Sequence, residues 1–207
     1  MDILADSLGP EATYKLLTGV VVPRPIAWVS TISTTGVVNL APFSAFTFVS
    51  TKPPMVGINV GRKAGQLKDT ARNIHATREF VVNIADETMI DTVHLSAIEY
   101  APEISETELL GLELAPSRHI SAPRLLAAPI SLECRLHRVI AFGDTGSEFT
   151  VGEISVFHIR DGLLENGRID SEKLRPICRI GGPNYAKLGE IVRMQPVSQT
   201  EKTVLDL

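Results

Sequence analysis

The stretch RPIAWVSTISTTGVVNLAPFSAFTFVSTKPP, residues 24–54, decides the fold class. Residues 26–33 are rich in β-forming side chains, residues 33–36 are a turn signal, and residues 37–50 form a second β run. Pro42 interrupts this second run, so we expect a bend, a bulge or a sheet edge there. The hairpin also carries more polar side chains than a core needs, which leaves two interpretations: a solvated strand face, or a strand that lines a ligand cleft.

Further strands follow on both sides of one helical segment. We predict strands over 54–60 and 80–85, and the runs 129–142 and 147–162 are joined by Gly-Asp-Thr-Gly, a strong hairpin signal. Short turns between consecutive strands favour an antiparallel sheet that closes into a barrel over a parallel doubly wound sheet. The fold class is therefore predicted to be mainly β with short helices.

The helical segment begins near residue 67. Leu67, Ala71 and Ile74 have the i, i+4, i+7 spacing of a short amphipathic helix, and Asp69 is a plausible N-cap. Residues 87–98 also have a helical pattern. The whole chain, 1–207, is predicted to be a single domain with a helical and loop excursion at about 87–125.

Composition excludes several classes of protein. Of the 207 residues, 44% are hydrophobic and 21% charged, which is typical of a globular chain with a real core. The formal net charge of −4 argues against a nucleic-acid binder, which normally carries a basic stripe. The sequence contains no apolar run of membrane-spanning length and no secretory signal, so we expect no membrane partner and a cytoplasmic location.

Motif spacing excludes several chemistries. The sequence has neither a Rossmann fingerprint nor a P-loop, and it has no H-E-x-x-H, Cys-x-x-Cys or G-x-S-x-G motif. Cys134 with His137 is too little for a metal site, so no metal is expected. Cys134 itself is interpreted as a buried thiol in an alternating strand.

A cationic cluster precedes the predicted helix. Arg62, Lys63 and Lys68, with the hydroxyl of Thr70, lie just before or at the helix start. A helix N-terminus offers unpaired backbone N–H groups and a partial positive charge, so this arrangement suits a phosphate. An ordinary solvated loop with a capped helix is the alternative.

The order of motifs in residues 24–83 resembles the flavin reductase-like family of FMN-binding split barrels. The segments that carry the resemblance are RPIAWVST, NLAPFSAFTFVSTKPP, KDTARNI and EFVVNI, and later EISVFHIRDGLL and RIGGPNYAKLG. The family implies a six-stranded antiparallel Greek-key barrel, FMN as cofactor, and a homodimer with FMN near the subunit interface.

The resemblance also implies roles for individual residues. The residues that would line the flavin ring and ribityl chain are Ser30, Thr31, Asn39, Ala41, Pro42 and Ser44. Arg62, Lys63, Lys68 and Thr70 would hold the phosphate. His158 and Tyr185 fall in matching C-terminal segments and would approach the flavin or the nicotinamide, which leaves His158 as the one candidate catalytic side chain.

The chemistry that the family implies is the cofactor's own. NADH or NADPH would pass hydride to the flavin, and the reduced flavin would pass electrons to an acceptor or a partner monooxygenase. Two alternatives remain open on sequence alone. One is a non-enzymatic FMN-binding electron carrier reduced by a protein donor, and the other is a barrel that has lost its flavin.

Overall fold

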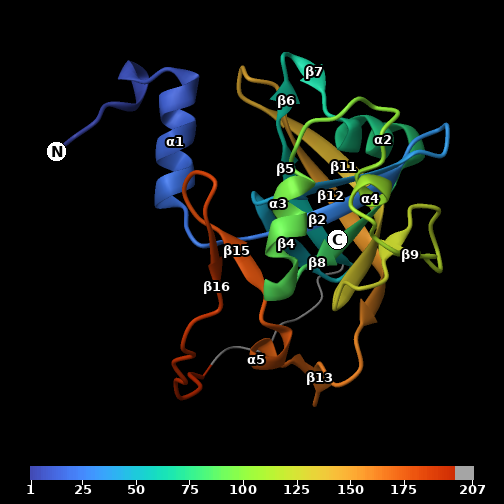
Figure 1. Ribbon diagram of the computed structural model, residues 1–207. Helices are drawn as coiled ribbons and strands as arrows, with labels where there is room; N and C mark the ends of the chain where they lie inside the picture. The colour runs from blue at the N-terminus through green and yellow to red at the C-terminus, as the bar shows by residue number, and fades with distance from the viewer. Residues whose placement is uncertain (199–207) are drawn as a thin grey trace.

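A seven-stranded antiparallel sheet forms the centre of the protein (Figure 1). The computed structural model describes residues 1–198. The strand order in the sheet is β3-β2-β8-β11-β12-β5-β4. The strands are β2 (Ala27–Ile32), β3 (Val38–Phe43), β4 (Phe46–Thr51), β5 (Pro54–Val60), β8 (Glu79–Ile84), β11 (Ile130–Phe142) and β12 (Ser147–Ile159). The mainly β class predicted from the sequence is confirmed.

The sheet curls because one β run joins its two ends. β3 and β4 lie at opposite ends of the strand order, yet only Ser44 and Ala45 separate them in the chain. The Asn59 N–H of β5 donates to the Ala45 carbonyl at 2.8 Å, directly beside this break. The break follows Pro42 by two residues, and Pro42 itself lies inside β3, opposite Trp28 of β2. The family resemblance implies six strands, whereas this sheet has seven, with the run 37–50 divided here between β3 and β4.

Branched aliphatic side chains and close-packed rings fill the interior. Ala27, Val29, Ile58, Phe80 and Val82 are almost fully buried in one cluster. Gly152 faces the Phe80 ring so closely that a Cβ at this position would overlap it. A glycine is therefore required on β12 to admit the ring.

A second apolar cluster fixes a short helix over the outside of β2 and β3. Trp28, Leu40 and Val93 are buried in it, and Val93 belongs to α3 (Ile90–Leu95). The Trp28 indole N–H donates to the Ser96 hydroxyl at 2.8 Å, just past the end of α3. This contact positions the chain that follows Ser96.

The helix that follows the cationic cluster begins at Asp69, one residue earlier than an N-cap at Asp69 would allow. α2 spans Asp69–Thr77, and its N-cap is Lys68. The prediction of Asp69 as N-cap is therefore wrong: Asp69 is the first helical residue, its carboxylate caps no N–H group, and it pairs with Arg72 instead. The region predicted to be helical at 87–98 contains η2 (Glu87–Met89) and α3, and the rest of the predicted excursion contains α4 (Glu106–Leu109).

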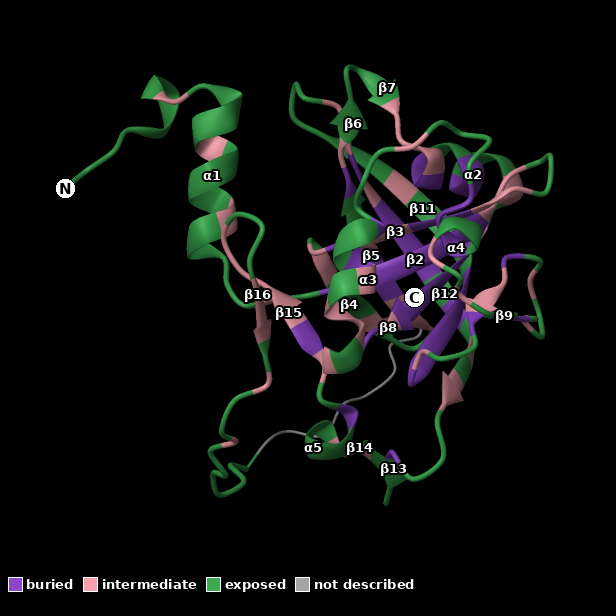
Figure 2. Ribbon diagram, in the orientation of Figure 1, coloured by how far each residue is buried: buried purple, intermediate pink, exposed green. Residues whose placement is uncertain are grey.

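The N-terminal helix and a C-terminal hairpin lie beside the barrel. α1 (Pro10–Val20) has no buried residue and is almost wholly exposed in Figure 2. It stands next to the small sheet of β1 (Arg24–Pro25), β15 (Ile177–Arg179) and β16 (Tyr185–Lys187) (Figure 1). In residues 1–198 no helix is long and apolar enough to span a membrane.

Short elements complete the chain. They are η1 (Ala5–Ser7), β6 (Arg62–Lys63), β7 (Gln66–Leu67), β9 (Leu114–Ala115), β10 (Arg124–Leu125), β13 (Leu164–Glu165), β14 (Arg168–Ile169) and α5 (Ser171–Leu174).

Candidate functional site

Two adjoining cavities lie along β3. The first, which we call the α2 cavity, has a volume of about 220 Å³. The second, the Tyr185 cavity, has a volume of about 330 Å³. Asn39 and Ala41 line the first, Pro42 and Ser44 line the second, and Ala97 lines both. β3 therefore connects the two cavities into one candidate site.

The α2 cavity collects the cations of the loop before the helix. Its wall includes Lys63 at the end of β6, and Lys68 and Thr70 at the start of α2. The backbone N–H groups of the first turn of α2 have no intrahelical acceptor, so they add a partial positive charge to the same place. Two ammonium groups and a helix N-terminus make this cavity suitable for an anion.

Glu99 already supplies an anion to these cations. Its carboxylate lies 3.2 Å from the Lys63 Nζ and 4.0 Å from the Lys68 Nζ. Glu99 follows α3 and also lines the α2 cavity. All three side chains are about half exposed, so these ion pairs are weak and a more highly charged ligand can replace them.

Hydrogen bonds between the barrel and α2 hold Thr70 in position. The Asn39 amide donates to the Thr70 hydroxyl oxygen at 2.9 Å, and both side chains are buried. The Asn73 amide donates to the Thr31 hydroxyl oxygen at 3.0 Å, one strand further in. Because the Thr70 oxygen accepts from Asn39, its own O–H proton remains available to a ligand in the cavity.

A buried carboxyl forms another part of the α2 cavity wall. Glu106 of α4 accepts the Leu40 N–H of β3 at 2.8 Å. β3 has β2 on one side only, so Glu106 serves as acceptor on its free edge. Burial raises the pKa of the Glu106 carboxyl above its ordinary value, although the bond from Leu40 opposes the shift. The excursion after α3 thus covers the site and contributes polar groups to it.

Arg24 joins the separate parts of the Tyr185 cavity. Its guanidinium donates to the carbonyls of Thr18 and Val21, both at 2.6 Å, at the end of α1. It also donates to the Ile180 carbonyl at 3.2 Å and to the Ser44 hydroxyl at 3.3 Å. One residue therefore connects the N-terminal helix, the C-terminal hairpin and the break between β3 and β4.

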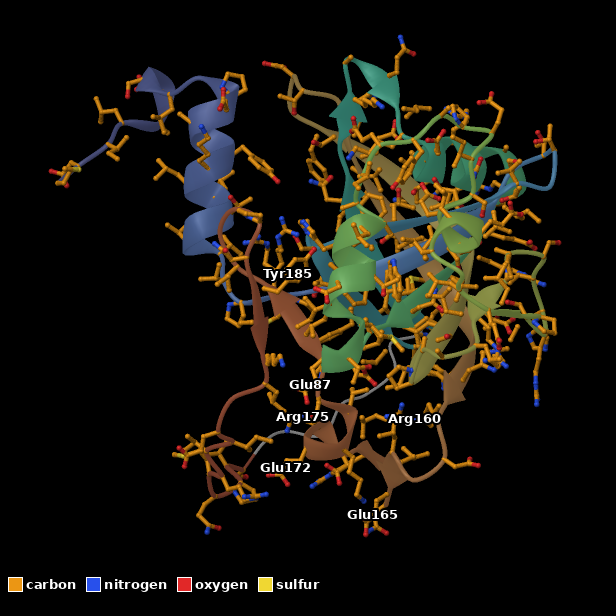
Figure 3. All side chains as sticks on the ribbon, in the orientation of Figure 1. Glu87, Arg160, Glu165, Glu172, Arg175 and Tyr185 are labelled. Carbon is orange, nitrogen blue, oxygen red and sulfur yellow. The ribbon has the colours of Figure 1, made fainter. Side chains whose placement is uncertain are left out.

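Tyr185 and Arg179 form the opposite wall of the Tyr185 cavity. The Arg179 guanidinium donates to the Tyr185 phenol oxygen at 2.7 Å and lies 4.6 Å from the centroid of the Tyr185 ring. The His94 ring meets Tyr185 edge-on. Burial raises the pKa of the Tyr185 phenol, and the neighbouring Arg179 opposes this shift. Tyr185 is thus a neutral hydroxyl at neutral pH, in contact with Arg179. Figure 3 labels Tyr185 beside the C-terminal hairpin.

The structure brings eight of the twelve predicted site residues to these two cavities. They are Asn39, Ala41, Pro42, Ser44, Lys63, Lys68, Thr70 and Tyr185.

The four other predicted residues lie elsewhere. Ser30 and Thr31 are fully buried, and Ser30 donates to the Pro123 carbonyl at 2.5 Å. Arg62 turns away from the α2 cavity and pairs with Glu148 at 2.8 Å. His158 lines a separate cavity and pairs with the buried Glu133 at 2.6 Å. None of the four lines the α2 cavity or the Tyr185 cavity.

Sequence reasoning missed Glu99, Glu106, Arg24 and Arg179. Arg24 opens the hairpin that decides the fold, but its bonds reach residues 18 and 180, and no local pattern reveals them. Glu99 and Glu106 belong to the excursion, where the sequence offered only their charge.

Comparisons with known proteins agree with this geometry. The sequence model of the family described as flavin reductase like domain matches residues 19–173. An uncharacterized protein of Halalkalibacterium halodurans is 45% identical over 195 residues, which cover 92% of this chain and 93% of that protein.

Two solved structures are similar over almost their full lengths. Nitrilotriacetate monooxygenase component B from Bacillus cereus is 40% identical with a TM-score of 0.91, and the match covers 94% of this chain and 98% of that chain. The 2-nitrobenzoate 2-nitroreductase NbaA of Pseudomonas fluorescens is 34% identical with a TM-score of 0.87, and the match covers 98% and 99%.

Proposed function

This chain belongs to the flavin reductase like family, and on that basis we propose that it is an FMN-binding oxidoreductase that uses NADH or NADPH. The observation that carries the proposal is the α2 cavity, where Lys63, Lys68 and the start of α2 adjoin Asn39 of β3. Such a site suits a ligand that carries a phosphate at one end and a planar ring at the other.

The residues of the α2 cavity fit a flavin phosphate. Lys63 and Lys68 would neutralise its charge, and the Thr70 hydroxyl and the first N–H groups of α2 would donate hydrogen bonds to its oxygens. Lysine acts here as a point charge, so a modest shift of its flexible side chain from Glu99 to the ligand is sufficient. Arg62 has no part in this arrangement, because Glu148 holds it outside the cavity.

The ring end would follow β3 toward the Tyr185 cavity. Asn39 and Ala41 of β3 precede Pro42 and Ser44 in the chain, so the first two would contact the ribityl chain and the last two the ring. When bound, the flavin would supply the hydride and electron chemistry. The protein would orient the ring and exclude water from it, with Tyr185 and Arg179 offering fixed donors at the edge of the cavity.

The electron acceptor is proposed from the similar proteins. Nitrilotriacetate monooxygenase component B supports a partner oxygenase as acceptor, and NbaA supports a small nitroaromatic as an alternative acceptor. An electron carrier reduced by a protein donor is the second candidate function, and the bound flavin would then not respond to free nicotinamide.

We also propose a homodimer with the flavin near its interface. α1 exposes Tyr14, Leu17 and Val20, and β4 exposes Phe48 at three quarters of its surface. Apolar side chains gathered on a helix without a buried residue suit coverage by a second copy. Sedimentation velocity of the purified protein tests this, and a monomer at micromolar concentration contradicts it.

The experiment that tests the function is an anaerobic absorption spectrum. The purified protein, loaded with FMN, should lose its absorption near the visible flavin maximum when NADH or NADPH is added. A flavin that binds but is reduced only by a protein donor contradicts the nicotinamide part and favours the carrier. Failure to bind added FMN contradicts the whole proposal.

A further inference from the structure

A third cavity, of about 240 Å³, lies where β10 meets the end of β12, and it shares no lining residue with the candidate site. We call it the Arg124 cavity. Arg160, one of its lining residues, is well separated from Tyr185 in Figure 3. The cavity is lined by Arg124, Leu126, Ala127, Ala128, Pro129, His158, Ile159 and Arg160. Any ligand of this cavity is therefore distinct from a flavin in the α2 cavity.

Arg124 is a half-buried cation without an acceptor. Within residues 1–198 its guanidinium makes no hydrogen bond and no ion pair, and its Nε is the one enclosed side-chain nitrogen or oxygen that lacks a partner there. Enclosing a guanidinium N–H without an acceptor is unfavourable, because buried polar groups in native proteins are almost always paired. Among the same residues the two Nη groups also lack a partner but are not enclosed, so they are open to an acceptor in the cavity. An unpaired arginine beside a cavity therefore points to an acceptor that enters from outside.

The other basic side chains of the cavity already have carboxylate partners. Arg160 lies 3.5 Å from Asp86, and His158 lies 2.6 Å from Glu133. Glu133 is fully buried, and although burial raises its pKa, bonds from the Arg118 N–H, from His158 and from the His119 N–H together lower it. Among the basic side chains that line this cavity, Arg124 is thus the one without a carboxylate partner in the described part of the chain. A ligand with a single negative charge would balance it.

The other side chains that line the cavity are aliphatic. Leu126, Ala127, Ala128, Pro129 and Ile159 surround the basic side, so a ligand with an apolar body gains from burial there. The planar guanidinium pairs with a carboxylate through two parallel hydrogen bonds. We propose that the Arg124 cavity binds a small organic carboxylate, whose carboxylate group pairs with Arg124 and whose apolar body lies against the segment 126–129.

Calorimetric titration with benzoate tests this proposal. The titrations use the full chain saturated with FMN, so that the flavin site is filled, and benzamide serves as an uncharged ligand of the same shape. We expect benzoate to bind at least tenfold more tightly than benzamide. Equal binding of the two ligands, or no binding of benzoate, overturns the proposal.

Two variants locate the binding. Arg124→Met removes the charge and keeps a long side chain, and it should weaken benzoate binding at least tenfold without changing the FMN titration. Ala127→Trp fills the cavity from an exposed position, where the fold tolerates a large side chain, and it should abolish benzoate binding while Arg124 remains. Arg138→Met, a change of an exposed arginine on β11, is the matched control and should bind benzoate like the wild type.

The two variants also separate the proposal from its alternatives. Benzoate binding that survives both Arg124→Met and Ala127→Trp lies elsewhere on the protein and overturns the assignment. Inorganic phosphate that binds as tightly as benzoate shows a plain anion site and overturns the organic part of the assignment. If Arg124→Met fails to fold, Ala127→Trp alone still decides the question.

Discussion

Glu99 and Lys63 are ion-paired within the α2 cavity, with 3.2 Å between the carboxylate and the ammonium. In the proposed complex the flavin phosphate takes the place of this carboxylate, so Glu99 has to leave before the ligand binds. Glu99→Gln should therefore tighten FMN binding by about two- to tenfold, because it removes both the competing ion pair and the repulsion from the phosphate. Quenching of flavin fluorescence measures the affinity.

Riboflavin and a second glutamate are the controls for Glu99→Gln. Riboflavin carries no phosphate, so its affinity should be the same in the variant and the wild type. Glu108→Gln, on the exposed side of α4, should leave both affinities unchanged. Weaker FMN binding by Glu99→Gln, or an equal gain for riboflavin, contradicts competition for the lysines.

Lys68 and Arg62 are neighbours in the cationic cluster but should differ in their effect on FMN. Lys68→Met removes a cation from the cavity wall, and since a charge-assisted hydrogen bond contributes about 1.5–3 kcal/mol, FMN affinity should fall about ten- to hundredfold. Arg62→Met removes a partner of Glu148 outside the cavity and should leave the FMN affinity within about twofold of wild type. An equal loss of FMN affinity in both variants would show that Arg62 also binds the phosphate.

The sequence predicts those site residues that lie close together in the chain. Lys63, Lys68 and Thr70 lie within eight positions around a helix start, so the local pattern alone brings them together. The prediction fails for Arg62 because adjacent residues of a strand point to opposite sides, so the side chain of Arg62 points away from that of Lys63.

Long-range contacts explain the remaining differences from the structure. Ser30 and Thr31 point to opposite faces of β2, and both faces are covered, because Ser30 bonds to the Pro123 carbonyl and Thr31 to the Asn73 amide of α2. Glu99 reaches the lysines only because Trp28 and Ser96 fix the end of α3 over the barrel. α1 begins with Gly9-Pro10, a recognisable helix start, but with no buried face it has no core pattern to reveal it.

Glu106 should make the edge of β3 sensitive to pH. Glu106→Ala leaves the buried Leu40 N–H without its acceptor and should lower the free energy of unfolding by about 1–3 kcal/mol, whereas Glu106→Gln keeps an acceptor oxygen and should cost less. The folded-state pKa is raised, so the folded protein binds the proton more tightly than the unfolded chain. The stability of the wild type relative to Glu106→Gln should therefore fall as pH rises from the ordinary value of 4.5 through the raised one.

Urea unfolding of the wild type and both Glu106 variants across this pH range measures the difference. Glu108→Gln serves again as the exposed control and should follow the wild type at every pH. A stability difference between wild type and Glu106→Gln that does not change with pH contradicts a raised pKa.

Glu133 should have the opposite pH dependence, because its folded-state pKa is lowered. Its ionised carboxylate accepts the Arg118 and His119 N–H groups at 2.6 and 2.8 Å and pairs with His158, so it holds the loop before β10 against β11. This contribution is fully present above the unfolded value near 4.5 and is lost as pH falls through the lowered value. Glu133→Gln should therefore destabilise the protein by about 1–3 kcal/mol at pH 7 and lose less stability than the wild type on acidification.

Glu79→Gln is the matched control, since Glu79 accepts the Ser121 N–H of the same loop at 2.8 Å, but in a hydrogen bond that is exposed to solvent. An exposed carboxylate exchanges its partner for water at little cost, so Glu79→Gln should change the stability by less than about 1 kcal/mol and keep the acid response of the wild type. Urea unfolding at pH 7 and in mild acid compares the three proteins. If both glutamine variants lose the same stability, or if Glu133→Gln keeps the full acid response, the buried carboxylate is not the group that titrates.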